Sequence, residues 1–377
     1  MSQLYRIVVL LVLVALVTSC GVPATPITSP QAKDLRWLNL SDDDFSNRAD
    51  ELLYADFNTR TKWPSADKMP AGFDPIKVME LGKDPGLGIR NLHNQGFTGK
   101  GVAIAIIDLT LLVKHIEYKD RIRIYEVAED VTGKWSEVQM HGPAVASIAV
   151  GRTIGVAPDA DLYYIATGGC GEFKNMEDFD FSCRAKAIHR IVEINRSLPE
   201  SQKIRVLSMS FGWDLHSKGY DAITATVNEA KKDGIFVISS SLSESYSFHF
   251  HGLGRSPLSD PNEFQSYEPG LRWQEDFYKN GFPTATLFVP MDSRTTADLT
   301  GNEDYVFYRE GGRSWSIPYL AGMYALAVQV KPDITPDEFW DTALKTGKTI
   351  QLQHDGKEYE FGVILDPQTL INAIKGK

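Results

Sequence analysis

Residues 101–108 read GVAIAIID, a run that is apolar on both of its alternating faces and ends in an acidic residue. A strand of this kind is buried on both sides, which is typical of the parallel sheets of α/β proteins. Four later runs share this character: ADLYYIA (160–166), IRVLSMSFG (204–212), GIFVISSS (234–241) and TATLFVP (284–290). We therefore predict an α/β, doubly wound fold with a mainly parallel central sheet flanked by helices.

Helical patterns separate these runs. In RAKAIHRIVEI (184–194) and YDAITATVNEAKKDG (220–234), apolar residues recur every three or four positions. The segment LSDDDFSNRADELL (40–53) predicts a further helix, which Ser41 caps and whose first turn is acidic. The chain has no internal repeat.

The distribution of charge argues against nucleic-acid binding. The formal net charge is -10, and the lysines and arginines are spread along the chain, whereas nucleic-acid binders gather cations on one face. The sequence GFTGKG (96–101) is rich in glycine, but it precedes a strand, and a phosphate-binding loop follows one. We therefore expect neither a nucleic acid nor a dinucleotide as partner.

The N-terminus predicts export. The run IVVLLVLVALV (7–17) is too short for a comfortable membrane span and suits the core of a signal peptide. It is followed by TSC, which resembles a bacterial lipobox, so residues 1–19 are interpreted as a signal peptide and Cys20 as the lipidated first residue. An ordinary signal peptide remains the alternative. In the lipoprotein interpretation the protein is lipid-anchored on the extracytoplasmic side of the bacterial cell membrane.

Two further segments precede the apolar strands. Residues 20–34 are rich in Pro, Ser and Thr and predict a flexible tether. Residues 35–85 are interpreted as an N-terminal extension packed on the core. Further along, export permits a disulfide between Cys170 and Cys183, with two free thiols as the alternative.

Three residues of types used in catalysis stand at the ends of predicted elements. Asp108 ends the first strand, His141 begins the small-residue run HGPAVAS (141–147), and Ser314 begins an apolar helix over 313–330. Taken singly, each has an ordinary explanation, because aspartate and serine cap turns and helices and most histidines are structural. In parallel sheets, however, sites form at the carboxyl ends of strands.

Four motifs in this order resemble the subtilase family of serine peptidases, from about residue 86 to residue 377. They are the strand ending in Asp108, the run HGPAVAS followed by GVAP (155–158), VLSMSFG (206–212) and GRSWSIPYLAG (312–322). The chain order Asp, His, Ser is also that of subtilisin. The resemblance makes residues 86–377 the catalytic domain.

The resemblance implies the chemistry of a serine endopeptidase. Ser314 would be the nucleophile, His141 the acid and base, and Asp108 the residue that orients the histidine. The backbone N–H of Ser314 would bind the oxyanion, and the partner would be a peptide or protein substrate. This chemistry requires no cofactor and no metal. Structural calcium is common in the family, but the sequence contains no oxygen-rich loop that indicates it.

The resemblance also implies a substrate cleft. An extended peptide would pair with a strand edge formed by Ser210, Phe211 and Gly212. The neighbouring pocket would be lined by Ser240, Ser241 and Leu242, and Leu242, where the family has glycine, would narrow it.

The chain departs from the family in its second oxyanion donor. The family uses an asparagine side chain where this chain has Ser243, and in subtilisin the loss of that donor costs on the order of 100- to 1,000-fold in rate. The Ser243 hydroxyl is the candidate substitute, and the alternative is another donor from the long, serine-rich segment that follows. Arg313, beside Ser314, either pairs with an acidic residue or contacts the substrate.

Three functions therefore stand side by side. The favoured one is a membrane-tethered serine endopeptidase. The missing asparagine sustains an alternative, a catalytically weak or inactive scaffold that binds peptides or a protein partner. A solute-binding lipoprotein is disfavoured because it predicts two similar lobes. His249 and His251 fall on one face of an extended segment, but no carboxylate at a suitable spacing completes a metal site.

Overall fold

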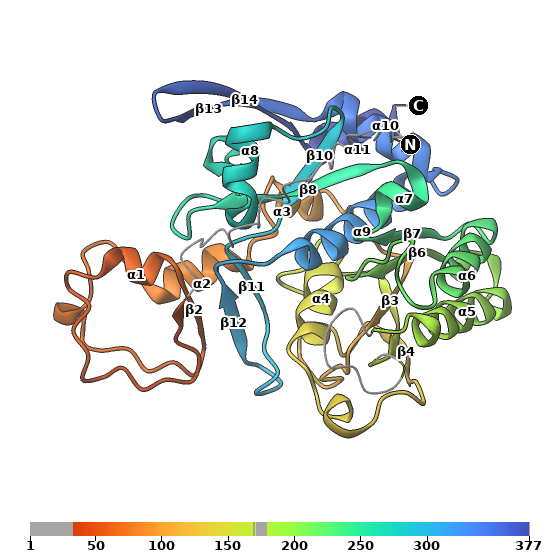
Figure 1. Cartoon of the computed structure of the whole chain (residues 1–377), viewed down its shortest axis with the longest axis horizontal. Helices are drawn as coiled ribbons and strands as arrows, with labels where there is room; N and C mark the ends of the chain where they lie inside the picture. The colour runs from red at the N-terminus through yellow and green to blue at the C-terminus, as the bar shows by residue number, and fades with distance from the viewer. Residues whose placement is uncertain (1–32, 169, 171–178, 377) are drawn as a thin grey trace, which may run out of the picture.

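The computed structural model describes residues 33–168, 170 and 179–376 (Figure 1). The predicted signal peptide, Cys20 and most of the predicted tether lie outside these residues. Within the described part of the chain, none of the helices has the length and apolar character needed to cross a bilayer.

The central sheet has five strands, all parallel, which confirms the predicted fold class. Of the five predicted runs, three lie next to one another at its centre: ADLYYIA, GVAIAIID and IRVLSMSFG. The run GIFVISSS forms one edge. The other edge is a strand that the sequence analysis missed. In spatial order the strands are β4 (Ile122–Val127), β5 (Asp161–Ala166), β3 (Ala103–Asp108), β6 (Ile204–Met209) and β7 (Phe236–Ser239).

Alternate residues of β3 enter two different cores. Ala105 and Ile107 belong to a cluster formed with α5 (Ser182–Ser197) and α6 (Tyr220–Lys232). Ile104 and Ile106 belong to the opposite cluster, formed with α4 (His141–Val150) and α9 (Arg313–Val330). The two helix pairs therefore cover opposite faces of the sheet, as the two-sided apolar pattern predicts.

The run TATLFVP does not join the central sheet, contrary to our expectation. It forms the central strand of a second, mixed sheet. The strands on either side of it were not revealed by the sequence pattern, so the pattern could not assign it to this sheet. The order of that sheet is β13 (Lys348–His354), β14 (Lys357–Ile364), β10 (Thr286–Pro290), β8 (His249–Arg255) and β9 (Tyr267–Pro269).

The N-terminal segment forms part of a third sheet. Its order is β1 (Lys33–Asp34), β2 (Ala55–Asn58), β12 (Tyr305–Tyr308) and β11 (Arg294–Ala297). The strand β1 thus lies at the end of the predicted tether. The pairing of β2 with β12 joins the segment to the hairpin that precedes Ser314.

The helix predicted over residues 40–53 is largely absent. Only α1 (Ala49–Leu53) is helical, and Ser41 caps nothing, since its hydroxyl donates to the side chain of Asn39. The backbone N–H of Ser46 bonds to the Asp44 carboxylate at 2.9 Å, which is a local turn. Asp, Asn and Ser compete with helix formation in this way.

The remaining helices are short and surround the second sheet and the N-terminal segment. They are α2 (Pro75–Lys83), α3 (Ile89–Asn94), α7 (Leu242–Tyr246), α8 (Gln274–Asn280), α10 (Pro336–Thr346) and α11 (Pro367–Lys375). Single 3₁₀ turns are η1 (Ala66–Lys68), η2 (Gly133–Ser136), η4 (Glu200–Gln202), η5 (Phe264–Ser266) and η6 (Leu271–Trp273).

Candidate active site

The three candidate catalytic residues meet at the carboxyl edge of the central sheet. Asp108 is the last residue of β3, His141 the first of α4 and Ser314 the second of α9. The helices α4 and α9 pack against each other on one face of the sheet (Figure 1). The ring of Trp315, next to Ser314, lies 5.5 Å from the ring of His141.

Asp108 and His141 form a close hydrogen-bonded pair. The Nδ1 of His141 lies 2.6 Å from Oδ1 of Asp108, which is only 2 % exposed. The same oxygen accepts the backbone N–H of Leu109 at 2.8 Å. Because an ionised carboxylate only accepts, Nδ1 carries the proton and Nε2 keeps a free lone pair. The imidazole is therefore set up to accept a proton at Nε2.

Gly142 allows α4 to begin close to the end of β3. A Cβ at this position would lie 2.7 Å from each of three oxygen atoms, the carbonyls of Leu109 and Thr110 and the hydroxyl of Tyr164. Tyr164 is buried and its hydroxyl donates to the Leu109 carbonyl. Only a residue without a side chain fits, so the close approach explains the glycine after His141.

Ser314 does not bond to His141 in this structure. Its hydroxyl donates to the carbonyl of Ser210 at 3.3 Å, and the Ser210 hydroxyl donates to the Ser314 carbonyl at 2.9 Å. The backbone N–H of Ser314 lies in the first turn of α9, where no helical carbonyl can accept it. That N–H and the positive end of the helix dipole can stabilise an anion here.

A buried aspartate shapes the turn before the nucleophile candidate. Asp292 accepts the N–H of Gly311 at 3.0 Å with one oxygen and the N–H of Leu271 at 2.8 Å with the other. Burial raises the pKa of Asp292 to about 6. The sequence analysis missed Asp292, although it lies two residues after the apolar run TATLFVP. Its position is similar to that of Asp108 at the end of the first strand.

Ser243 is not free to bind an oxyanion in this conformation. It lies in α7, and its hydroxyl donates to the carboxylate of Glu244 at 2.7 Å. Leu242 is fully buried in the hydrophobic core, so the prediction that it narrows an open pocket is wrong. An alternating pattern predicts which way a side chain faces only within a strand. Leu242 lies beyond the end of β7, in α7, so the pattern does not apply to it.

The segment Ser210–Gly212 is held by Ser314 at its first residue and by the chain after β7 at Phe211. The Phe211 carbonyl accepts the N–H of Ser240 at 2.9 Å, and the Ser241 hydroxyl bonds to both the N–H and the carbonyl of Trp213 at 2.7 and 2.6 Å. The N–H and carbonyl of Gly212 form no hydrogen bond within the described residues. Free groups of this kind can pair with an extended peptide.

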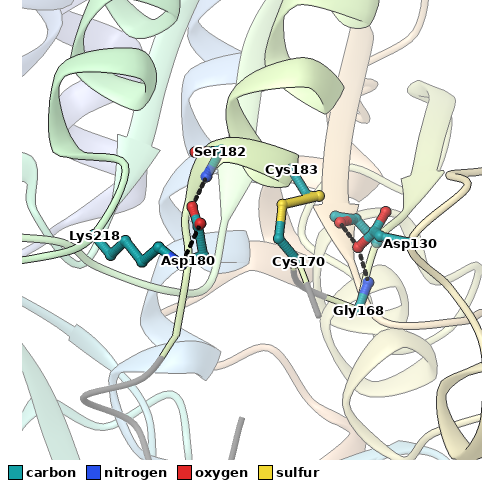
Figure 2. The surroundings of a disulfide bond; sticks show 8 residues. Asp130, Gly168, Cys170, Asp180, Ser182, Cys183 and Lys218 are labelled. Atoms are coloured by element: carbon teal, nitrogen blue, oxygen red, sulfur yellow. Dashed lines mark hydrogen bonds and ion pairs between the residues drawn. A yellow bond between two sulfur atoms is a disulfide. The ribbon is translucent and has the colours of Figure 1, made fainter. Parts of the chain in front are cut away.

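The structure joins Cys170 and Cys183 in a disulfide, with their Cα atoms 5.4 Å apart (Figure 2). The bond ties the chain after β5 to the start of α5. Asp130 accepts the N–H of Gly168 at 2.9 Å on one side of it, and Asp180 accepts the N–H of Ser182 at 2.9 Å on the other. Of the two alternatives that the sequence left open, the structure has the bonded pair.

His249 and His251 face different environments. His249 is exposed, whereas His251 is buried against the rings of Trp273 and Phe282, at 4.5 and 4.1 Å. Burial, assisted by the charge of Arg313, lowers the pKa of His251 to about 4. Among the described residues, no cluster of three or more His, Cys, Asp or Glu is placed to hold a metal.

A surface cavity of 910 Å³ lies elsewhere, at the amino end of β6. Its lining includes Arg196, Lys203 and Arg205 and none of the three candidate catalytic residues. We therefore locate the site by the chemistry of its residues and not by the size of a cavity.

Comparison with known proteins identifies relatives of this chain. Residues 99–267 match the model of the subtilase family, a range that contains Asp108 and His141 but not Ser314. The chain is 25% identical over 305 residues to serine protease AprX of Bacillus subtilis (strain 168), and the match covers 72% of this chain and 66% of that protease.

A solved structure supports the fold. The prenylagaramide maturation protease PagA superposes with a TM-score of 0.50 at 14% identity, over 77% of this chain and 99% of PagA. The superposition supports the fold alone, and together with the all-parallel sheet and the match of residues 99–267 to the family model it makes the chain similar to the subtilase family of serine peptidases.

Proposed function

We propose that this protein is an exported, membrane-tethered serine endopeptidase that hydrolyses peptide bonds through an acyl-enzyme. The observation that supports the proposal most strongly is the 2.6 Å bond between Asp108 and His141. It leaves Nε2 of the imidazole free at the edge of the sheet where Ser314 begins α9. The name of the relative AprX, a serine protease, agrees with this activity.

In the proposed reaction, all three residues act both in acylation and in deacylation. His141 takes the proton of the Ser314 hydroxyl as Oγ attacks the substrate carbonyl, and Asp108 stabilises the imidazolium that forms. The Ser314 N–H binds the oxyanion of the tetrahedral intermediate. His141 then gives its proton to the leaving amine, and water repeats the sequence on the acyl-enzyme. No cofactor takes part in these steps.

The reaction requires a rotation of the Ser314 side chain. Its hydroxyl must leave the Ser210 carbonyl and turn to Nε2 of His141. The present bond is long, at 3.3 Å, so little is lost in breaking it. Catalytic hydrogen bonds often tighten only when substrate is bound.

The second candidate function is a weak or inactive scaffold that binds peptides or a protein partner. A specific observation favours it: Ser243 bonds to Glu244, so its hydroxyl does not stand in for the family's asparagine in this conformation. In this case the free edge at Gly212 would hold a peptide without cleavage.

A fluorophosphonate probe distinguishes the two functions without a known substrate. The full chain, purified in detergent micelles, is treated with the probe beside Ser314→Ala, His141→Ala and a control, Ser201→Ala, at an exposed serine. We expect labelling of the wild type and the control, with and without EDTA, and none in the other two variants. Absence of labelling in a wild type whose circular dichroism shows a folded protein would favour the scaffold.

The membrane tether is tested separately. We expect the wild type to sediment with membranes and to incorporate radioactive palmitate, and Cys20→Ser to do neither. A Cys20→Ser protein that still fractionates with membranes would contradict the lipid anchor and leave the catalytic proposal unaffected.

A further inference from the structure

Arg313 is a cation beside the candidate nucleophile that, among the described residues, contacts aromatic rings but no acidic partner. It opens α9, directly before Ser314. Its guanidinium carbon lies 5.7 Å from the centre of the Trp273 ring and 5.9 Å from that of Phe250. Its Nε is buried without a hydrogen-bond partner. Within the described residues, its guanidinium forms neither a hydrogen bond nor an ion pair, which removes the simple explanation that it serves an acidic neighbour.

Two other buried arginines are held by oxygen atoms, whereas the buried Arg184 and Arg294 each have an Nε without a partner among the described residues. Arg255 donates to the carbonyls of Ser259 and Ser293, and Arg309 donates to the carbonyl of Leu53 and to the Ser293 hydroxyl. Buried polar groups are normally hydrogen-bonded, and those that are not need an explanation. Carbonyl oxygens hold Arg255 and Arg309, but none holds the Arg313 guanidinium among the described residues. Arg313 differs from Arg184 in its place directly before the candidate nucleophile, which makes a group of the substrate the candidate partner.

The acidic groups near Arg313 are already occupied. Glu310 forms an ion pair with Arg272 at 2.6 Å, and the carboxylate of Glu244 accepts the Ser243 hydroxyl. Burial lowers the pKa of Arg313, and the attraction of Glu244 only opposes this effect from a distance. An arginine nevertheless stays charged at neutral pH, so the site holds an uncompensated positive charge.

The position of this charge directly before Ser314 makes the substrate a source of the matching anion. An extended peptide advances about 3.3 Å per residue, and an arginine side chain spans about two such steps, so Arg313, one residue from Ser314, can reach the substrate residues closest to the attacked bond. Its planar fork of donors matches a carboxylate and can bind both oxygens. The surrounding Trp273 and Phe250 rings exclude water and strengthen such a contact.

We propose that Arg313 is a specificity-determining residue, which binds an aspartate or glutamate side chain of the substrate at a position flanking the scissile bond. The inference rests on the proposed peptidase function, because it names the substrate class of the same site. A carboxylate there would give Arg313 the partner that the protein itself does not supply.

The test compares peptides that differ in one charge. The full chain is incubated with internally quenched peptide mixtures, degenerate except for one position fixed as Glu or Gln, and mass spectrometry of the products locates each cleavage. We expect Glu next to the cleaved bond to raise kcat/KM over Gln by on the order of 10- to 100-fold. In Arg313→Met this ratio falls to about one, and in Arg313→Lys, which keeps the charge but not the fork, it is intermediate.

Arg272→Met is the matched control, since it removes an arginine that also borders Trp273 but is paired with Glu310. Its Glu/Gln ratio should equal that of the wild type. An equal fall in both variants would indicate general charge attraction and overturn the proposal. So would an Arg313→Met enzyme that loses the same factor on Glu and Gln peptides, because that would place Arg313 at the oxyanion or in the structure of the loop.

A binding measurement separates this inference from the peptidase function. In the Ser314→Ala protein no bond is cleaved, and the affinities for fluorescein-labelled Glu and Gln peptides are read by anisotropy, with and without Arg313→Met. A Glu preference that depends on Arg313 supports the inference even if the wild type never cleaves. Cleavage without any such preference would leave the peptidase intact and exclude the role of Arg313.

Discussion

The two halves of the candidate active site are held in different ways. Asp108 and His141 stand on β3 and α4, which are buried in the largest described core, and they bond at 2.6 Å. Ser243, where the family's second oxyanion donor is expected, stands on a five-residue helix, and its hydroxyl bonds to the exposed Glu244. Core packing holds Asp108 and His141, the proton-transfer half, in place, and there the sequence keeps the family pattern. Ser243, the donor half, lies on a short surface helix, and there the sequence departs from the family pattern.

Asp108→Asn should have the largest effect, because it attacks the well-held half. An asparagine can donate to Nδ1, which would place the proton on Nε2 and leave no base for Ser314. We expect the rate of fluorophosphonate labelling to fall by about 10⁴-fold, with the melting temperature as the control for folding. A fall of less than tenfold would mean that the pair does not operate as a proton-transfer unit.

Ser243→Asn should repair the donor half. An amide at this position can reach further than the hydroxyl and supply the second oxyanion donor. We expect labelling to accelerate on the order of 100-fold, the factor that such a donor contributes. If the rate stays unchanged, another group already supplies the donor, and the two halves are more alike than the structure suggests.

His251→Phe should remove a dependence of stability on pH from the wall next to Arg313. The pKa of His251 is about 4 in the folded protein, against about 6.5 when unfolded. The unfolded chain therefore binds more protons between these values, and stability is lost as the pH falls through this window. Relative to wild type, urea unfolding of the variant should gain up to about 3 kcal/mol from pH 7 to pH 4. If the unfolding free energies of wild type and variant changed with pH in the same way, His251 would not be buried as a neutral ring.

Ser243→Ala should have the smallest effect. The hydroxyl is engaged with Glu244 at 2.7 Å on a partly exposed helix, so its removal costs about one exposed hydrogen bond. We expect labelling to change by less than about threefold. A loss near the 100-fold of a true oxyanion donor would assign Ser243 to catalysis and remove the contrast between the halves.

The buried half was predictable from sequence, since burial leaves a pattern. The two-sided apolar run before Asp108, the small residues after His141 and the apolar helix from Ser314 each indicate a packed environment. Their order along the chain then allowed the fold and the three residues to be named together. What the pattern could not give was strand pairing: β4 has intermediate and exposed residues, and β10 is as apolar as β3 yet belongs to another sheet.

The loops were less predictable, for local reasons. Leu242 faces the core because α7 turns the chain directly after β7, and the residues around Ser41 form turns in place of a helix. The position of Arg313 beside Ser314 could be assigned from sequence. Its lack of an acidic partner among the described residues could not, since the sequence does not show which carboxylates lie close to it.

The pairing of β2 with β12 has a consequence for the order of folding. Phe57 pairs with Phe307 and Asn58 with Val306, so these contacts join residues about 250 positions apart in the sequence. Such distant contacts form late, because a long loop must close first. The hairpin that leads into Ser314 is therefore joined to the N-terminal segment only after the chain as far as β12 is available. A truncated or partly synthesised chain would contain Asp108 and His141 on a formed sheet, yet leave the nucleophile's approach unfinished.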